Sequence, residues 1–183
     1  MAVKNKTRKE VNAASKSTKY NYIITLVAAS IVDWAALAAL WKAKTGAKIT
    51  SKLPLLELPE GESEADQYHT IECKPGTVVP TINAGEAPQD GRAEITAIAE
   101  GVDENTLDWA YNMQGEEVVA IIERCSDGMK LLFANPCTGG VTFQYQSIGA
   151  QDGGTAGVNF TLTGADCPEP MLVYEPAQAP SNS

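Results

Sequence analysis

Residues 141–163 read VTFQYQSIGAQDGGTAGVNFTLT, and this stretch decides the fold class. Its first eight residues alternate: one side carries Val141, Phe143, Tyr145 and Ser147, and the other carries Thr142, Gln144, Gln146 and Ile148. A period of two predicts a strand with one buried face. The glycine-rich residues 149–157 then lead into a second strand at residues 158–163. We therefore expect two strands whose polar face meets solvent, a lumen or another subunit.

Further segments rich in β-branched and aromatic residues also read as strands. They are residues 22–27, 69–73, 92–99, 117–124, 130–134 and 171–174. Turn signals such as Ser126-Asp127-Gly128 separate them, and short strands at intervals of about 8–12 residues are typical of a sandwich or barrel. We predict one mainly β domain over residues 20–176, built as two packed antiparallel sheets with seven or eight strands and two short helices.

The first helix is predicted around residues 30–44. Ser30 followed by Asp33 resembles a helix start, and a carboxylate is favourable at the N-terminal end of the helix dipole. One apolar face is formed by Trp34, Leu37, Ala38 and Trp41. Lys42 and Lys44 fall in the last turn, and Gly46 is placed to end the helix.

The second helix is predicted over residues 103–113. Asp103 or Asn105 is expected to cap it, and Gly115 to end it. Its inward face is expected to carry Leu107, Ala110 and Tyr111.

Charge is divided unevenly along the chain. Ten of the fourteen Lys and Arg residues precede Leu53, whereas twenty-one of the twenty-three Asp and Glu residues follow it, so the two parts carry +8 and −17. Residues 1–19 form a basic arm, and residues 177–183 a polar tail. Opposite charges on one chain favour attraction between copies. The acidity after Leu53 argues against a nucleic-acid-binding surface there.

Four cysteines, at positions 73, 125, 137 and 167, lack the spacing of a zinc site. Their even number allows two disulfides in an exported protein, but free cysteines in a cytoplasmic protein are the favoured interpretation. The apolar residues 22–41 follow a basic stretch, as a membrane anchor would. Asp33 at their centre, the many alanines and the local helix signals argue against that anchor.

No credible active site emerges from the residues. The one histidine, His69, has no nucleophile motif beside it. The glycine-rich GAQDGGTAG lacks the Lys-Ser/Thr of a phosphate-binding loop, and the acidic run ELPEGESEAD does not fit a calcium loop. We expect no catalysis, no cofactor and no metal.

The order of elements in the second half resembles the tail tube (major tail) proteins of long-tailed bacteriophages and prophages. The segments that carry the resemblance are DENTLDWAYNMQG, EVVAIIERCSDG, MKLLFANP, VTFQYQSIGAQDGGTAG and VNFTLTGADCPEPM, with a weaker echo in SIVDWAALAALWKAKTG. It covers residues 92–174. The resemblance implies two packed β-sheets, hexameric rings and rings stacked into a tube whose inner β-barrel conducts DNA. It implies a virion protein, assembled in the bacterial host cytoplasm.

Two sets of residues become candidates for assembly on this interpretation. The inter-ring candidates are Lys4, Lys6, Arg8, Lys9, Lys16 and Lys19 of the arm with Glu57, Glu60, Glu62, Glu64 and Asp66. The inter-subunit barrel candidates are Thr142, Gln144, Gln146, Asn159, Thr161 and Thr163. The expected partners are further copies of the chain and other tail proteins, namely the tape measure, the tail terminator and the baseplate or hub. DNA would pass through an acidic lumen without specific binding.

Two other interpretations stay open at this point. One is an exported β domain anchored by residues 22–41 and closed by disulfides. The other is a different phage particle component, such as a capsid decoration or tail terminator protein, which would form closed oligomers without tubes.

Overall fold

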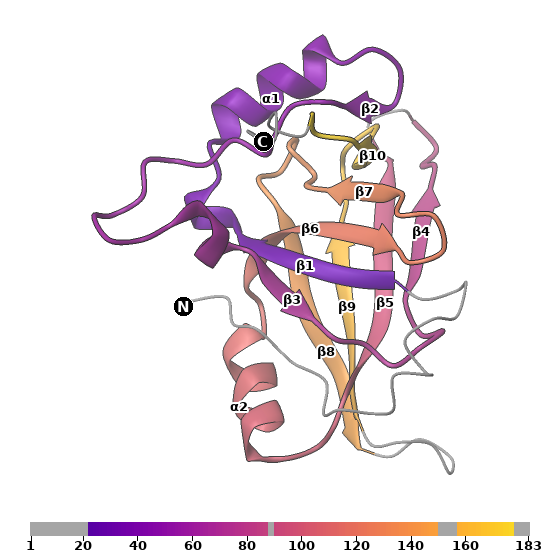
Figure 1. The fold of residues 1–183 in the computed structure, drawn as a ribbon. Coiled ribbons are helices and arrows are strands. Elements are labelled where there is room, and N and C mark those ends of the chain that lie inside the picture. The colour runs from indigo at the N-terminus through magenta and orange to yellow at the C-terminus, as the bar shows by residue number, and fades with distance from the viewer. Residues whose placement is uncertain (1–21, 88–89, 150–156, 178–183) are drawn as a thin grey trace.

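The computed structural model describes residues 22–87, 90–149 and 157–177 (Figure 1). The basic arm predicted at residues 1–19 lies outside these residues, as does the predicted tail from residue 178 onward. The strands are β1 (Tyr22–Ala28), β2 (Lys48–Ile49), β3 (His69–Ile71), β4 (Val79–Asn83), β5 (Arg92–Glu100), β6 (Glu117–Arg124), β7 (Lys130–Phe133), β8 (Val141–Gly149), β9 (Gly157–Gly164) and β10 (Met171–Tyr174). The helices are α1 (Trp34–Ala43) and α2 (Glu104–Met113), with short 3-10 turns at Ala29–Ile31 and Glu64–Gln67.

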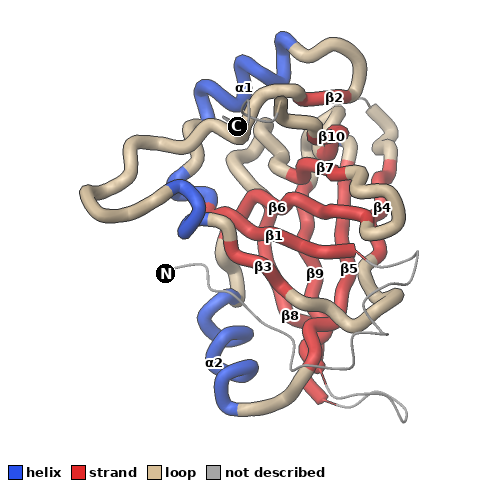
Figure 2. The backbone as a smooth tube through the Cα atoms, in the orientation of Figure 1, coloured by secondary structure: helices blue, strands red, loops and turns tan. Residues whose placement is uncertain are grey.

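Hydrogen bonds join these ten strands into one strongly curled sheet in the order β2-β10-β7-β6-β8-β9-β5-β4, and β1 lies between β6 and β3. The strands β1, β3, β6 and β7 lie in front of the layer of β8, β9 and β5, and β4 lies at the side of this layer (Figures 1 and 2). The sequence predicted two separate packed sheets. The two layers are instead continuous, because Glu117 and Val118 of β6 pair with Thr142 and Val141 of β8.

On the opposite side of the curled sheet, the segment after β3 contacts β5 through an isolated bridge. Cys73, just after β3, pairs with Ala99 of β5, and the Lys74 N–H donates to the carbonyl oxygen of Ile98 at 2.7 Å. The chain then turns and forms β4 against the other half of β5. As a result, β4 extends the β8-β9-β5 layer beyond the point where the two layers meet.

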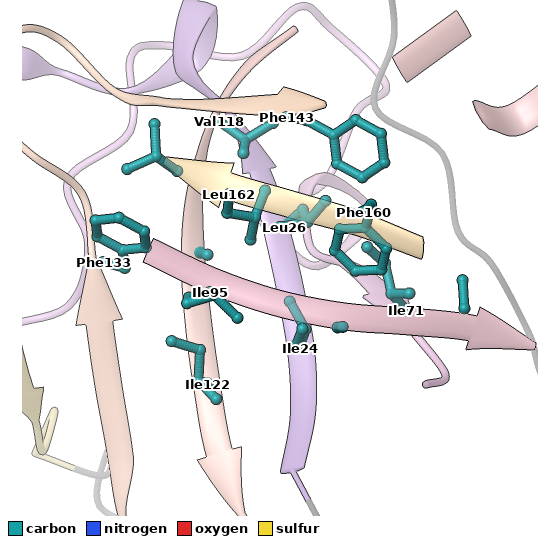
Figure 3. Close-up of a cluster of buried hydrophobic side chains, with 14 of the residues drawn as sticks. Ile24, Leu26, Ile71, Ile95, Val118, Ile122, Phe133, Phe143, Phe160 and Leu162 are labelled. Carbon is teal, nitrogen blue, oxygen red and sulfur yellow. The ribbon is translucent and has the colours of Figure 1, made fainter. Parts of the chain in front are cut away.

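The inner core fills the space between the two layers (Figure 3). Ile24, Leu26, Ile71, Val118 and Ile122 come from β1, β3 and β6, and they face Ile95, Phe143, Phe160 and Leu162 from β5, β8 and β9. Phe143 and Phe160 stack with ring centroids 5.0 Å apart, and Trp109 of α2 meets both rings edge-on. These apolar positions alternate along each strand, which confirms the period of two expected from the sequence.

A second, outer core lies between the front layer and α1. Leu37 and Trp41 of α1 pack there with Val119 and Ile121 of β6. The side chains of β6 therefore enter both cores in alternation, which explains the continuous apolar run VVAII that the sequence shows.

The helix ends follow from local hydrogen bonds. Asp33 caps α1, because its carboxylate accepts from the Ala36 N–H at 3.0 Å; the predicted start at Ser30 is wrong, since Ser30 lies in a preceding 3-10 turn. In α2, Asp103 rather than Asn105 is the cap and accepts from the Thr106 N–H at 2.8 Å. The predicted inward position of Tyr111 is also wrong, because this side chain is 59% exposed.

Three features of the sheet are not predicted by the sequence. The strands β2 and β4 were not predicted, because one is only two residues long and the other is exposed on both faces and interrupted by Pro80. In β8, a register irregularity between Tyr145 and Ser147 shifts the alternation. Ile148 consequently packs against the inner core, not on the polar side where it was expected.

Candidate functional site

The outer face of the β8-β9-β5 layer gathers the predicted barrel candidates on one surface. Residues directly opposite each other in a sheet share a face. Gln144 pairs with Thr161, which in turn pairs with Thr96. The rows on either side of this one are Thr142-Thr163-Glu94 and Asn159-Ile98. Gln146 joins the same surface, because its Nε2 donates to Thr161 Oγ1 at 3.3 Å. We call this surface the polar face.

The centre of the polar face is hollowed. A shallow depression of about 660 Å³ is lined by Thr96, Gln144, Gln146, Asn159, Thr161 and Thr163, and reaches Val79 of β4. Its charged lining residues are Arg92 and Glu94, whose Nη2 and Oε2 atoms lie 3.3 Å apart. Hydroxyl and amide groups hold water and make exchangeable hydrogen bonds without a fixed charge. The depression is therefore polar, and its charged lining residues carry one positive and one negative charge.

Two edges of this layer have no partner strand among the described residues. The outer edge of β4 is one; its Val79 and Ile82 side chains are 51% and 58% exposed. The other is the part of β8 beyond Tyr145, on the side away from β9. Unpaired N–H and C=O groups along an edge can add a strand from another chain.

The two free edges match in direction and in chemistry. Because β4, β5, β9 and β8 alternate in direction, β4 runs antiparallel to β8. Ile82 lies opposite Ala93 on the inner side of the layer. On the same side at the other edge, Tyr145 and Tyr111 form an aromatic pair with ring centroids 6.0 Å apart. An apolar side chain at one edge thus has apolar counterparts at the other.

The acidic inter-ring candidates lie in a different place. Glu57, Glu60, Glu62, Glu64 and Asp66 are all exposed on the long loop and 3-10 turn before β3, which project from the body (Figure 1). The loop is held at its base, where Val32 pairs with Leu55 and the Leu56 N–H donates to the Ile31 carbonyl oxygen at 2.8 Å. Their predicted basic counterparts, from Lys4 to Lys19, lie outside the described residues.

The upper rim of the polar face is fastened by a disulfide between Cys137 and Cys167. The expectation of free cysteines is therefore wrong for this pair, because the turn after β7 and the loop after β9 bring the two sulfur atoms together. Cys73 and Cys125 are free. Desolvation against the inner core raises the pKa of the Cys73 thiol, and partial burial with the nearby Glu123 carboxylate raises that of Cys125.

The remaining ionisable groups offer little chemistry. His69 lies on β3 opposite Leu26, and burial lowers its pKa, which favours the neutral imidazole. Within residues 22–87, 90–149 and 157–177, no three His, Cys, Asp or Glu side chains come together as a metal site would need. In the same residues, no helix has the length and apolar character to cross a membrane. Residues 22–41, the candidate anchor segment, are divided between β1, a 3-10 turn and α1.

The sequence pointed to the polar side chains of β8 and β9, but not to the neighbours that complete the face. The alternation of RAEITAIA could have predicted Glu94 and Thr96. In contrast, the five residues of β4 have no strand pattern that distinguishes them from the turn-rich sequence around them. Comparison of the chain with protein-family models, curated proteins and solved structures found no match, so the polar face and its two edges are the grounds for assigning a function.

Proposed function

We propose that the chain is a tail tube subunit of a long-tailed bacteriophage or prophage, which assembles into stacked, hexameric rings. The observation that carries the proposal is the polar face, a layer of four alternating strands that ends in two free, antiparallel edges. In a ring, β4 of one copy pairs with β8 of the next. An even number of strands per copy keeps every contact antiparallel, so the layers of all copies join into one closed barrel.

In this arrangement the sheet works as two packed layers. The polar face lines the bore, and the layer of β1, β6 and β7 with α1 forms the outer wall. A bore of Thr, Gln and Asn side chains lets DNA pass through a water film, since cations that grip phosphates are absent from the described depression apart from Arg92, which Glu94 neutralises. A second hollow at the rim is lined by Glu117 and Asp166 together with Arg92, so its charged side chains carry an excess of one negative charge.

Stacking of rings uses the charge division of the chain. The basic arm of one ring, through Lys4, Lys6, Arg8, Lys9, Lys16 and Lys19, meets the projecting acidic loop of the next. This contact is heterologous and continues indefinitely, as a tube requires. Each exposed ion pair contributes only about 0–1 kcal/mol, so strand pairing and apolar contacts supply most of the assembly energy. The tape measure, tail terminator and baseplate or hub proteins are the proposed further partners, in a virion assembled in the host cytoplasm.

Negative-stain electron microscopy of the untagged protein over a concentration series tests the proposal. Hollow tubes or six-fold rings support it. Closed rings that never stack favour a tail terminator or capsid decoration protein instead. A monomer at every concentration contradicts self-assembly.

A second candidate, an exported β domain, is favoured by the Cys137–Cys167 disulfide, since such bonds persist in oxidising compartments. It predicts a stable monomer that is secreted from cells and fails to fold under reducing conditions.

A further inference from the structure

The disulfide joins two loops, each of which connects a strand of one layer to a strand of the other layer. Cys137 lies in the turn between β7 and β8, and Cys167 in the loop between β9 and β10, with Cα atoms 5.5 Å apart. The two residues differ in accessibility: Cys137 is exposed, whereas Cys167 is only 1% exposed. A reagent in solution therefore reaches the pair from the Cys137 side.

Both loops are held in place by contacts that do not involve sulfur. Asn135 is buried, and its Nδ2 donates to the Ala165 carbonyl oxygen at 3.0 Å and to Thr138 Oγ1 at 2.6 Å. The backbone N–H of Asn135 also donates to the Pro170 carbonyl oxygen at 3.4 Å. These bonds tie the turn that carries Cys137 to the loop that carries Cys167.

The Cys167 loop has a second anchor at Gly91. The Cys167 N–H donates to the Gly91 carbonyl oxygen at 3.2 Å. The approach is so close that a Cβ at position 91 would lie 2.3 Å from the Cys167 carbonyl oxygen, so only glycine fits there. Hydrogen bonds and close packing that do not involve sulfur thus hold the two loops that carry the cysteines next to each other.

We propose that Cys137 and Cys167 form a late lock: the chain folds and assembles with both thiols reduced, and the bond forms afterwards, when the protein meets an oxidising medium. The timing relative to assembly rests on the proposed function, because a tail protein is built in a reducing cytoplasm and leaves it at lysis. The bond then adds stability to a rim that is already in its final shape.

The chemistry of closure needs only a small disulfide such as oxidised glutathione. The exposed Cys137 thiolate attacks one glutathione sulfur, so a mixed disulfide forms and a first glutathione leaves as thiolate. Cys167 sulfur then attacks Cys137 Sγ, which forms the protein disulfide and expels the second glutathione. The two protein thiols are oxidised, one oxidised glutathione is reduced to two thiols, and the two protons pass to the departing glutathiones.

The other two cysteines provide internal controls for this reaction. Cys125 is exposed but has no cysteine neighbour, so it stops at the mixed disulfide. Cys73 packs against the inner core and is less accessible than the exposed Cys125, and desolvation by burial also raises the pKa of its thiol. Oxidation of the folded chain should therefore yield one protein disulfide and one bound glutathione per molecule.

The experiment begins with full-length protein purified under reducing conditions. We expect it to be folded by circular dichroism, to lose two hydrogens and gain one glutathione on oxidation by mass spectrometry, and to rise in Tm by about 5–10 °C. A Cys137→Ser/Cys167→Ser variant should match the reduced protein and show no rise. Cys125→Ser should keep the rise and lose the bound glutathione.

Three results would overturn the lock. The first is that the reduced protein or the double serine variant is unfolded at room temperature. The second is that glutathione stays bound to Cys137 and is not displaced by Cys167. The third is that the disulfide forms without a change in Tm. Microscopy of the reduced protein separates this proposal from the tube: rings that stay reduced in oxidised glutathione contradict only the lock, whereas a monomer that locks as described contradicts only the assembly.

Discussion

Trp109 of α2 packs edge-on against Phe143 of β8, with ring centroids 5.3 Å apart and planes inclined at 78°. This contact fastens α2 to the inner core, because Trp109 is almost completely buried. We expect Trp109→Ala to lower the free energy of unfolding by about 3–5 kcal/mol, since it removes a buried indole and leaves a cavity. Urea denaturation followed by circular dichroism measures the loss. Tyr111→Ala, on the exposed side of the same helix, removes only the contact with the Tyr145 ring and should lower the free energy of unfolding by about 0.5–1.5 kcal/mol.

The cap of α2 gives a sharper test of helix geometry. Asp103→Ala removes the acceptor of the Thr106 N–H and should lower the free energy of unfolding by about 1 kcal/mol. Asn105→Ala, two residues further on, removes no cap and serves as the matched control. Equal losses in both variants would contradict the assignment of Asp103 as the cap.

The hairpin between β6 and β7 predicts a pH dependence. Arg124 binds the Asp127 carboxylate, with Nε donating to Oδ1 at 2.9 Å, and the Met129 N–H donates to the same oxygen; these bonds lower the pKa of Asp127 from 3.8 to about 2. Because the pKa in the folded chain is depressed, the stabilisation is complete above pH 4 and is lost as pH falls from about 4 to about 2. An NMR titration of the Asp127 carboxyl measures the pKa, and Arg124→Gln should raise it toward 3.8. An unchanged pKa in that variant would show that Arg124 is not the cause.

The free edge of β4 predicts which surface joins the copies. Ile82→Lys places a charge at the exposed edge and should abolish rings while the monomer keeps its fold, since lysine on an edge strand opposes strand addition. Ile23→Lys is the control, because Ile23 is also an exposed isoleucine on a strand but lies away from both free edges. Analytical ultracentrifugation compares the two. Rings in Ile82→Lys would exclude β4 as the joint.

The basic arm predicts a separation between ring formation and stacking. Residues 1–19 contain six basic side chains and one acidic side chain, so their deletion should shorten tubes more than it reduces the number of rings. Higher salt should act in the same direction, because exposed charges are screened. Tube lengths measured by electron microscopy decide the matter: lengths that depend neither on the arm nor on salt would remove the charge argument.

Local signals in the sequence predicted the parts of the fold that depend on short-range chemistry. The alternation in VTFQY, the cap at Asp103 and the left-handed Gly115 after α2 are set by neighbouring residues, and each is found in the structure. Gly46 is also left-handed, but it does not end α1, because the helix stops at Ala43 and Lys44 is already extended. The continuity of the sheet depends instead on two residue pairs between β6 and β8, which no local pattern encodes. The irregularity at Gln146 was missed for a similar reason, since it adjusts β8 to its partner β9.

The candidate site also has parts that local sequence predicts and parts that it does not. The polar character of Thr142, Gln144, Thr161 and Thr163 was evident, and antiparallel pairing places them together. The pairing of Cys137 with Cys167, thirty residues apart, follows from the meeting of two loops at the rim and has no signature in the spacing.

The position of β6 has a consequence for how the chain loses its structure. Val118, Ala120 and Ile122 point into one core, whereas Val119 and Ile121 point into the other. Neither core can be dissolved without removing the strand that supports the other. We therefore expect a single cooperative unfolding transition, so that both cores share one free energy of unfolding. The amide hydrogens of β6 should exchange with solvent only when the whole molecule unfolds.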